Sequence, residues 1–278
     1  MVGTANPSSL EPPSFPRMRY EDAVVGKEIY NFCGNRVVEQ ITTAGNVVAI
    51  KVKPPGSMDR SEGAMMQYAS THGILAPGAG GVYDIFAKRK PIACVLVSGL
   101  VQGEPLDEVW HDLDDRQKSD IQNQLREQFA LMRKCTETFI GRVGCTHARN
   151  SYDRIAQTFH GLFADEKEFD EWCLARLGTL TRWKWRRYLE KSRKDTPSKF
   201  VLTHGDLRPR NIMVKDGQVT GIIDWEKSGF YPDYAEYAFA MCLCHSHEEW
   251  WIPILKEILQ PCSEKRLELT RLVEDRGF

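Results

Sequence analysis

The fold is decided by the stretch His204-Gly205-Asp206-Leu207-Arg208-Pro209-Arg210-Asn211, which lies between two short apolar runs. The run before it covers residues 201–203, and the run after it covers residues 212–214. The dipeptide Asp216-Gly217 is a turn signal, and a third apolar run follows at residues 219–223. We therefore predict a short β section here, with a hairpin turn at Asp216-Gly217 and a polar loop between its first two strands.

Three residues of this section, Asp206, Asn211 and Asp224, fit the chemistry of phosphoryl transfer from a nucleotide. Such a transfer needs a carboxylate that orients the attacking hydroxyl and oxygen ligands that hold Mg²⁺ against the β and γ phosphates. We expect Asp206 to orient the nucleophile, and Asn211 and Asp224 to hold magnesium. The alternative is two unrelated polar turns with Asp224 as a helix N-cap, which the combined spacing between β segments disfavours.

The sequence HGDLRPRN, followed by GIIDWEKSGFYPDYAEYA, resembles the catalytic loop and metal-binding aspartate of the aminoglycoside phosphotransferase family, in particular its fungal branch. The likeness extends from about Asn31 to about His245 and includes GNRVV, EGAMMQYAS and VSGLVQGEPLDEVW. It implies an α+β, two-lobed, protein-kinase-like fold with a small strand-rich N-lobe and a larger, mainly helical C-lobe. It also implies ATP in the cleft and transfer of its γ-phosphoryl group to a hydroxyl of a small metabolite or an aminoglycoside-like substrate.

The first third of the chain is rich in strand and turn signals. The turn residues Ala44-Gly45-Asn46 separate two β-rich runs and predict a hairpin. The helix expected after it would carry Ala64, Met65 and Tyr68 on one face. We expect strands at 36–41, 47–52 and 92–97, a helix at 60–70 and a loop at 78–81.

Beyond about Leu106 the patterns become mainly helical. We expect helices at 114–134, at 169–188 and from about Tyr234, the first with four apolar residues at helical spacing, Ile121, Leu125, Phe129 and Met132. The order of elements predicts two lobes joined by a hinge over a cleft. The predicted boundaries are a flexible tail at 1–27, an N-lobe on the nucleotide side at 28–100, and a C-lobe with the catalytic loop and the substrate side at 101–278.

Lys51 is the candidate for holding the nucleotide phosphates. The stretch Val48-Ala49-Ile50-Lys51 resembles the kinase strand whose lysine holds the α and β phosphates. Lys53 lies on the same face of the strand, because side chains alternate along a strand, and it remains an alternative. Glu62, at the start of the predicted helix, is expected to pair with the lysine. The alternative is that both lysines are solvated strand charges and that Glu62 is an acid of the kind favoured at any helix start.

Arg208 and the predicted hinge complete the expected nucleotide site. Arg208 lies two residues after Asp206, at a position where it can stabilise charge on the transferred phosphoryl group. Arg210 is instead expected to be structural and to pin the loop through carboxylates. We expect the backbone of Val97, Ser98 and Leu100 to contact the nucleotide base, which leaves the choice between ATP and GTP open.

Two rival functions follow from the same motifs. A non-catalytic pseudokinase, acting as a nucleotide-binding or scaffold module, is disfavoured because Lys51, Asp206, Asn211 and Asp224 are all present. A protein kinase is disfavoured because the chain has neither a GxGxxG loop nor an APE-type segment after Asp224. Between Asn31 and Gln40 only Gly34 is available for a phosphate-binding turn.

The composition excludes some partners and leaves others open. The 278 residues contain 37 Lys and Arg and 38 Asp and Glu, and this balance disfavours a nucleic-acid partner. The apolar runs are too short to cross a bilayer, and residues 1–19 lack the apolar core of a secretory signal. The eight cysteines are scattered, so we expect reduced thiols in a cytoplasmic protein. The identity of the acceptor, the pathway and the oligomeric state stay open.

Three further sets of residues have both a functional and a purely structural interpretation. The segment Cys242–His247 offers four possible zinc ligands, but without a second pair nearby we expect packing cysteines. Asp233 and Glu236 would attract an amine-bearing substrate or serve as helix-start charges. Trp183 and Trp185 would stack on a substrate or, as we expect, pack in the core or on the surface.

Overall fold

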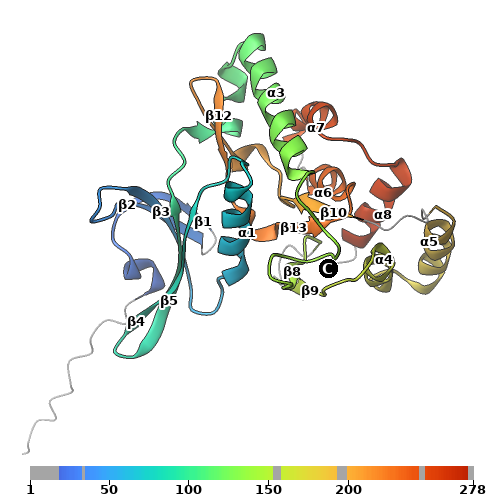
Figure 1. Cartoon of the computed structure of the whole chain (residues 1–278), viewed down its shortest axis with the longest axis horizontal. Helices are drawn as coiled ribbons and strands as arrows, with labels where there is room; N and C mark the ends of the chain where they lie inside the picture. Colours follow the sequence, from blue (N-terminus) through green and yellow to red (C-terminus); the bar gives the residue numbers. More distant parts are fainter. Residues whose placement is uncertain (1–18, 33–34, 153–157, 193–198, 244–247, 275–278) are drawn as a thin grey trace, which may run out of the picture.

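The N-terminal lobe is a five-stranded antiparallel sheet in the computed structural model of the chain (Figure 1), which describes residues 19–32, 35–152, 158–192, 199–243 and 248–274. The strand order is β1-β2-β3-β5-β4. The bounds are β1 Lys27–Phe32, β2 Asn35–Ile41, β3 Val47–Lys53, β4 Ala79–Ala87 and β5 Lys90–Gly99. The expected β2-β3 hairpin is confirmed, and its turn is closed by the N–H of Thr42, which donates to the carbonyl of Asn46 at 2.8 Å.

Alternation along β3 and β5 gives the sheet two different faces. One face is lined by buried aliphatic residues and is covered by the short 3₁₀ helix η1 (Tyr20–Ala23), in a cluster of Val38, Ile50, Val52, Ala93 and Val95. The opposite face turns Cys94 and Leu96 toward α1 (Arg60–Thr71) and the main core. Lys51 and Lys53 alternate with Ile50 and Val52, so both lysines face the side that meets the C-terminal lobe.

Three expectations for this lobe need correction. The stretch predicted as a loop at 78–81 contains the first residues of strand β4, because β4 begins at Ala79. Ala64 is exposed, whereas α1 buries Met65, Met66 and Ala69 instead. The predicted tail at 1–27 includes η1 and the first residue of β1, while residues 1–18 lie outside the described part of the chain.

The C-terminal lobe is mainly helical, as expected (Figure 1). The expected helix at 114–134 is α3, Asp115–Met132, and its four predicted apolar residues are buried. The single helix expected at 169–188 is two helices, α4 and α5, because the chain breaks near Gly178. These two helices are α4 Glu166–Ala175 and α5 Thr179–Ser192. The other described helices are α2 Leu106–Val109, α6 Ala235–Leu243, α7 Trp251–Ile258 and α8 Glu264–Glu274, with the 3₁₀ turn η2 at Trp110–Asp112.

Short strands embedded among these helices carry the polar loops. The hairpin β11–β12 is confirmed, and both residues of its turn, Asp216 and Gly217, have the positive φ that such a tight turn needs. The strands are β6 Glu104–Pro105, β7 Thr136–Glu137, β8 Ala148–Arg149, β9 Phe159–His160, β10 Phe200–Thr203, β11 Ile212–Lys215, β12 Gln218–Ile222 and β13 Gly229–Tyr231. They form the groups β13-β10-β7, β12-β11-β6 and β8-β9.

The connector between the lobes is attached to the strand that follows the polar loop. Pro105 and Glu104 of β6 pair with Met213 and Val214 of β11. Gly103 has a φ of 118°, and a side chain there would lie 2.4 Å from the carbonyl oxygen of Val214. Only glycine allows the connector to pass this close to β11.

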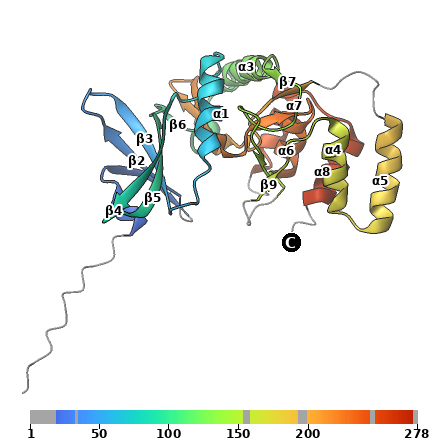
Figure 2. The same ribbon diagram turned by 60° about the horizontal axis from the view of Figure 1, so that its bottom comes forward.

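Figure 2 shows the sheet at one end of the molecule, α1 beside it, and α4 and α5 at the other end. Trp183 is exposed on α5, whereas Trp185 of the same helix is buried in the core. Six cysteines belong to the described residues, and all six are free. Of the segment weighed as a zinc site, residues 244–247 lie outside the described part. Among the described helices, none combines the length and the apolar character needed to cross a membrane.

Candidate active site

The polar loop at residues 204–211 is held from beneath by Glu236 of α6. The backbone N–H of His204 donates to Glu236 Oε2 at 2.5 Å, and that of Gly205 donates to Oε1 at 3.2 Å. The ring of His204 lies against the segment before Asp224, since its Nε2 is 3.0 Å from the carbonyl oxygen of Ile223. The polar loop and the segment before Asp224 are thereby fixed to each other.

Asp206, Asn211 and Asp224 are brought together by backbone contacts. The Nδ2 of Asn211 donates to the carbonyl oxygen of Asp206 at 2.9 Å, which closes the loop. The carbonyl of Asn211 in turn accepts the N–H of Ile223 at 2.8 Å, so Asn211 lies beside the residue that precedes Asp224. Asp224 has a φ of 63°, an uncommon conformation for a residue with a side chain. The three predicted residues therefore share one site.

Three cationic side chains surround the carboxylate of Asp206. The Nε of Arg208 is 3.2 Å from Oδ1, Lys227 Nζ is 3.7 Å from the same oxygen, and a terminal nitrogen of Arg210 is 3.9 Å from Oδ2. Asp206 and Arg208 are both buried, whereas the Arg210 side chain is 43% exposed. Arg208 is thus within reach of the group that Asp206 would orient.

Lys51 joins the two lobes. Its Nζ donates to the Glu62 carboxylate at 2.9 and 3.2 Å and to Asp224 Oδ1 at 2.9 Å. Glu62, on the first turn of α1, is 2% exposed. The strand lysine, the helix glutamate and the aspartate after β12 therefore meet at one atom, as expected for a nucleotide site of the kinase type.

A fourth charged residue at this position, Glu226, was not predicted from the sequence. Its Oε2 accepts Lys51 Nζ at 2.9 Å and Lys53 Nζ at 2.6 Å, and its other oxygen pairs with Arg149. No contact of Lys53 with Glu62 or Asp224 is present. Lys51 and Lys53 thus differ in their surroundings, although they lie on the same face of β3.

The charges at Lys51 set the protonation of the whole cluster. Burial lowers the pKa of Lys51, but the carboxylates of Asp224, Glu62 and Glu226 outweigh this effect and raise its pKa well above the ordinary value. Burial raises the pKa of Asp224, yet Lys51 more than compensates and holds this pKa below the ordinary value. Asp224 is therefore ionised near neutral pH, the state that a metal ligand needs.

The two glutamates of the cluster differ from each other. Burial raises the pKa of Glu62, and the attraction of Lys51 offsets this only in part. Burial also raises the pKa of Glu226, but the attraction of Lys51, Lys53 and Arg149 outweighs burial and holds this pKa well below the ordinary value. Oxygen atoms of Glu62, Asp224 and Glu226 all lie within 4.8 Å of one another, so this cluster has the ligand types for a divalent cation, with Lys51 now among them.

The residues expected at the hinge lie at the end of β5. Val97 pairs with Ile50, and Ser98 pairs with Ala49, so both residues still belong to the sheet. The N–H of Leu100 donates to the carbonyl of Val47 at 3.4 Å, and the connector to the second lobe begins there. Contact of Val97, Ser98 and Leu100 with a nucleotide base stays a prediction.

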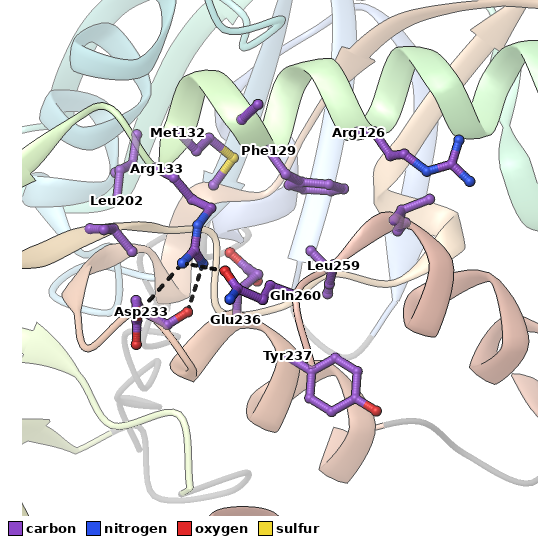
Figure 3. Close-up of a pocket in the computed structure, with 13 residues that line it drawn as sticks. Arg126, Phe129, Met132, Arg133, Leu202, Asp233, Glu236, Tyr237, Leu259 and Gln260 are labelled. Atoms are coloured by element: carbon purple, nitrogen blue, oxygen red, sulfur yellow. Dashed lines mark hydrogen bonds and ion pairs between the residues drawn. The ribbon is translucent and has the colours of Figure 1, made fainter. Parts of the chain in front are cut away.

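Asp233 and Glu236 have structural partners. Arg133 donates to the carbonyl of Asp233 at 2.8 Å and also contacts its carboxylate at 3.5 Å. Glu236 is buried between the polar loop and a cavity of about 140 Å³, and Figure 3 shows Arg133, Asp233, Glu236 and Tyr237 around this cavity. Both acids thus have protein partners, and their attraction of an amine-bearing substrate stays a prediction.

The sequence profile described as the phosphotransferase enzyme family matches residues 33–260. This chain belongs to that family. The match includes the polar loop at 204–211 and the residues that meet at Lys51. No curated protein matches this phosphotransferase closely enough to be counted as a relative.

Solved structures show that the phosphotransferase has the kinase-like fold expected from its motifs. It covers 89% of its length and 84% of a putative fructosamine-3-kinase from Thermobifida fusca YX-ER1, at 14% identity and a TM-score of 0.59. A thermostable mutant of aminoglycoside phosphotransferase APH(4)-Ia, in complex with ADP and hygromycin B, matches over 90% of this chain and 83% of that chain, at 13% identity and a TM-score of 0.57. Macrolide 2'-phosphotransferase MphH from Brachybacterium faecium matches at 17% identity over 89% and 80%, with a TM-score of 0.50.

Proposed function

We propose that this phosphotransferase is a small-molecule kinase that transfers the γ-phosphoryl group of ATP to a hydroxyl of its substrate. The observation that carries the proposal is the meeting of Lys51 with Glu62 and Asp224, on the segment beside the Asp206 loop. A cytoplasmic protein with a small-molecule substrate, and with no nucleic-acid or membrane partner, is part of the same proposal. Membership of the fungal branch of the family is also part of the proposal, and the motifs that resemble that branch support it.

Asn211 and Asp224 fit a magnesium ion. Asn211 uses its Nδ2 to hold the loop, which leaves the amide oxygen as the ligand atom. One oxygen of Asp224 accepts Lys51, and the side chain is 38% exposed, which leaves its second oxygen as a candidate ligand atom. Oxygen ligands of this kind are those that Mg²⁺ prefers, and Mg²⁺ bound there would neutralise charge on the β and γ phosphates.

The protein groups would then divide the work of the reaction. Lys51, a fixed cation facing the cleft, would hold the α and β phosphates, and Glu62 would keep it in place. Asp206 would orient the substrate hydroxyl and accept its proton as the new oxygen–phosphorus bond forms and the bond from the γ-phosphorus to the leaving ADP breaks. Arg208 would stabilise the charge on the transferred group, because it already lies beside Asp206.

The molecules bound in similar structures support this class of reaction. The APH(4)-Ia structure contains ADP and hygromycin B, and an amicoumacin kinase structure contains AMP-PNP, Ca²⁺ and amicoumacin. Both proteins share less than a fifth of their residues with this chain, so they support the nucleotide and leave the acceptor open. Function depends on the acceptor pocket rather than on the fold.

The first test measures the melting temperature with ATP, with and without MgCl₂. A ligand that binds the native state raises the melting temperature, by an amount that grows with its concentration. We expect a magnesium-dependent rise in the wild type and its loss in Asp224→Asn. The matched control is Asp233→Asn, which removes an exposed carboxylate outside the cluster and should keep the rise.

A panel of hydroxylated compounds, followed by release of ADP, then tests for transfer. ADP release that depends on one compound and is lost in Asp206→Asn supports the proposal. Nucleotide binding without transfer to any class of acceptor would favour the pseudokinase alternative. No magnesium-dependent binding at millimolar ATP would overturn the nucleotide site itself.

A further inference from the structure

Arg142 is completely buried at the junction of the two lobes. Its Nε donates to the carbonyl oxygen of Ser228 at 2.7 Å, and one terminal nitrogen donates to the hydroxyl of Ser61 at 2.7 Å. The guanidinium also pairs with the Asp59 carboxylate and donates to the carbonyl oxygen of Glu226. One planar side chain thus has four acceptors from two distant parts of the sequence.

The first pair of acceptors lies at the start of α1. Asp59 is the N-cap of this helix, and its Oδ1 accepts the N–H of Ser61 at 2.9 Å and the hydroxyl of Ser61 at 2.7 Å. Arg142 binds the other oxygen of Asp59. Glu62 is the next residue after Ser61, so the guanidinium fixes the turn that carries Glu62.

The second pair of acceptors lies just after Asp224. The carbonyls of Glu226 and Ser228 belong to the 3₁₀ turn η4 (Trp225–Lys227) and to the residue that ends it. Both carbonyls face Arg142, which therefore fixes the backbone that leaves Asp224. A role limited to neutralising Asp59 would not require these two carbonyls, because they carry no net charge.

The backbone of Arg142 is itself anchored. The carbonyl of Gly141 accepts the N–H of Phe230 at 2.7 Å, and the N–H of Arg142 donates to the carbonyl of Thr146 at 2.9 Å. The N–H of Val143 points to the sulfur of Met65 in α1, at 3.4 Å. The loop that presents Arg142 is thus attached both to α1 and to β13, the strand after η4.

We propose that Arg142 is a positioning residue that holds the Glu62 helix against the Asp224 segment, so that both acids meet Lys51 before a nucleotide binds. In kinases the lysine–glutamate pair and the metal-binding aspartate must both be in place, and their placement is often what regulation controls. In this protein, the buried side chain of Arg142 would itself hold Glu62 and Asp224 in place. The inference rests on the proposed nucleotide site.

The test compares three variants by calorimetric titration with AMP-PNP and MgCl₂, and by melting temperature. In Arg142→Met we expect the dissociation constant to rise roughly tenfold or more, because Glu62 and Asp224 are no longer held together. Arg142→Lys keeps a charge for Asp59 but lacks the planar fork, so it should restore stability better than affinity. The matched control is Arg266→Met, which removes another largely buried arginine that pairs with Glu166 and Asp170 in the C-terminal lobe.

The outcomes separate the inference from the proposed function. Binding that weakens in Arg142→Met but not in Arg266→Met, at a similar loss of melting temperature, supports the inference. Equal affinity of wild type and Arg142→Met, or equal weakening in both variants, overturns it. If the wild type does not bind, the proposed function fails instead.

A fourth variant keeps the test decisive if Arg142→Met does not fold. Asp59→Asn removes the ion pair, while asparagine still caps the helix. We expect a severalfold rise in the dissociation constant for this variant, and affinity equal to the wild type would overturn the inference.

Discussion

The carboxylate of Glu236 accepts the backbone N–H of His204 at 2.5 Å. This contact places a buried acid directly beneath the loop that carries Asp206. Burial is the main cause that raises the pKa of Glu236, to about 7, although the N–H groups of His204 and Gly205 act in the opposite direction. The support of the loop is therefore coupled to pH.

The first prediction concerns stability between pH 4.5 and 7. The pKa of Glu236 is higher in the folded chain than its ordinary value of 4.5, so the unfolded chain loses this proton first as the pH rises. The stabilisation from this group is complete below pH 4.5 and is lost as the pH rises through 7, a change of roughly 2–3 kcal/mol. Glu236→Gln does not titrate there, and it should lack this decline.

Urea unfolding of both proteins across this range measures the effect. Groups that the two proteins share cancel in the difference between their unfolding free energies, so the decline can be assigned to Glu236. Parallel curves for the two proteins would mean that Glu236 has the same pKa in the folded and unfolded chains.

A second prediction separates Lys51 from Lys53. Lys51→Met removes the cation that meets Glu62 and Asp224, and we expect kcat/KM for ATP to fall roughly 10²–10³-fold. Lys53→Met removes only a partner of Glu226 and should have a smaller effect. Steady-state kinetics with varied ATP provides the comparison, and the reverse order would assign the phosphates to Lys53.

A third prediction tests the role of Asp206. Replacing it by asparagine removes the group that would accept the proton, so kcat should fall by roughly 10²–10⁴-fold. Binding of Mg-ATP should persist, because Asp206 does not contact Lys51. Asp216→Asn is the matched control, since Asp216 lies in the β11–β12 turn and asparagine tolerates its positive φ. Turnover near that of the wild type in Asp206→Asn would refute the assignment.

A fourth prediction concerns the glycine of the loop. Gly205 has a φ of 78°, and a Cβ there would lie 2.6 Å from the carbonyl oxygen of Lys227. Gly45 has a similar φ of 83° but open space around it. Both alanine variants should lose about 1–2 kcal/mol from backbone strain, and Gly205→Ala should lose more because of the clash. Equal losses in chemical denaturation would show that the loop moves aside at no cost.

The sequence was most informative where function depends on residues close together in the chain. Asp206 and Asn211 lie five positions apart, and Asp224 follows a hairpin that its turn residues already predicted. The alternation of a strand also indicated that Lys51 and Lys53 share a face. Alternation could not distinguish the two lysines, because the difference between their contacts depends on Glu62 and Glu226, which come from other elements.

Arg142 and Glu226 could not be predicted, because their roles depend on contacts across long stretches of sequence. Arg142 lies in an irregular loop, and its partner Asp59 is 83 positions away. Glu226 follows Asp224 by two residues, a position that local patterns assign equally well to a surface turn. The sequence does show an acidic residue directly after Trp225. Its place in the site depends on contacts with Lys53 and Arg149, which lie far away in the sequence.

Local patterns also failed for two elements of the fold. Strand β4 begins with Ala79, and the next two residues, Gly80 and Gly81, favour a loop by propensity, but pairing with β5 overrides that preference. The helix expected at 169–188 is interrupted near Gly178, where the weak helix propensity of glycine was a usable signal.

The attachment of the connector to β11 restricts how the cleft can open to exchange nucleotide. Glu104 and Pro105 are paired with the strand that follows the polar loop, and the carbonyl of Gln102 accepts the hydroxyl of Thr220 at 2.5 Å, so a rotation of the sheet would pivot before Gln102. Such a rotation separates Lys51 from Asp224, whereas the bond between Asn211 and Asp206 lies wholly on the other side of the pivot. Under the proposed function, spent nucleotide would then leave while Asp206 and Asn211 keep their arrangement for the next turnover.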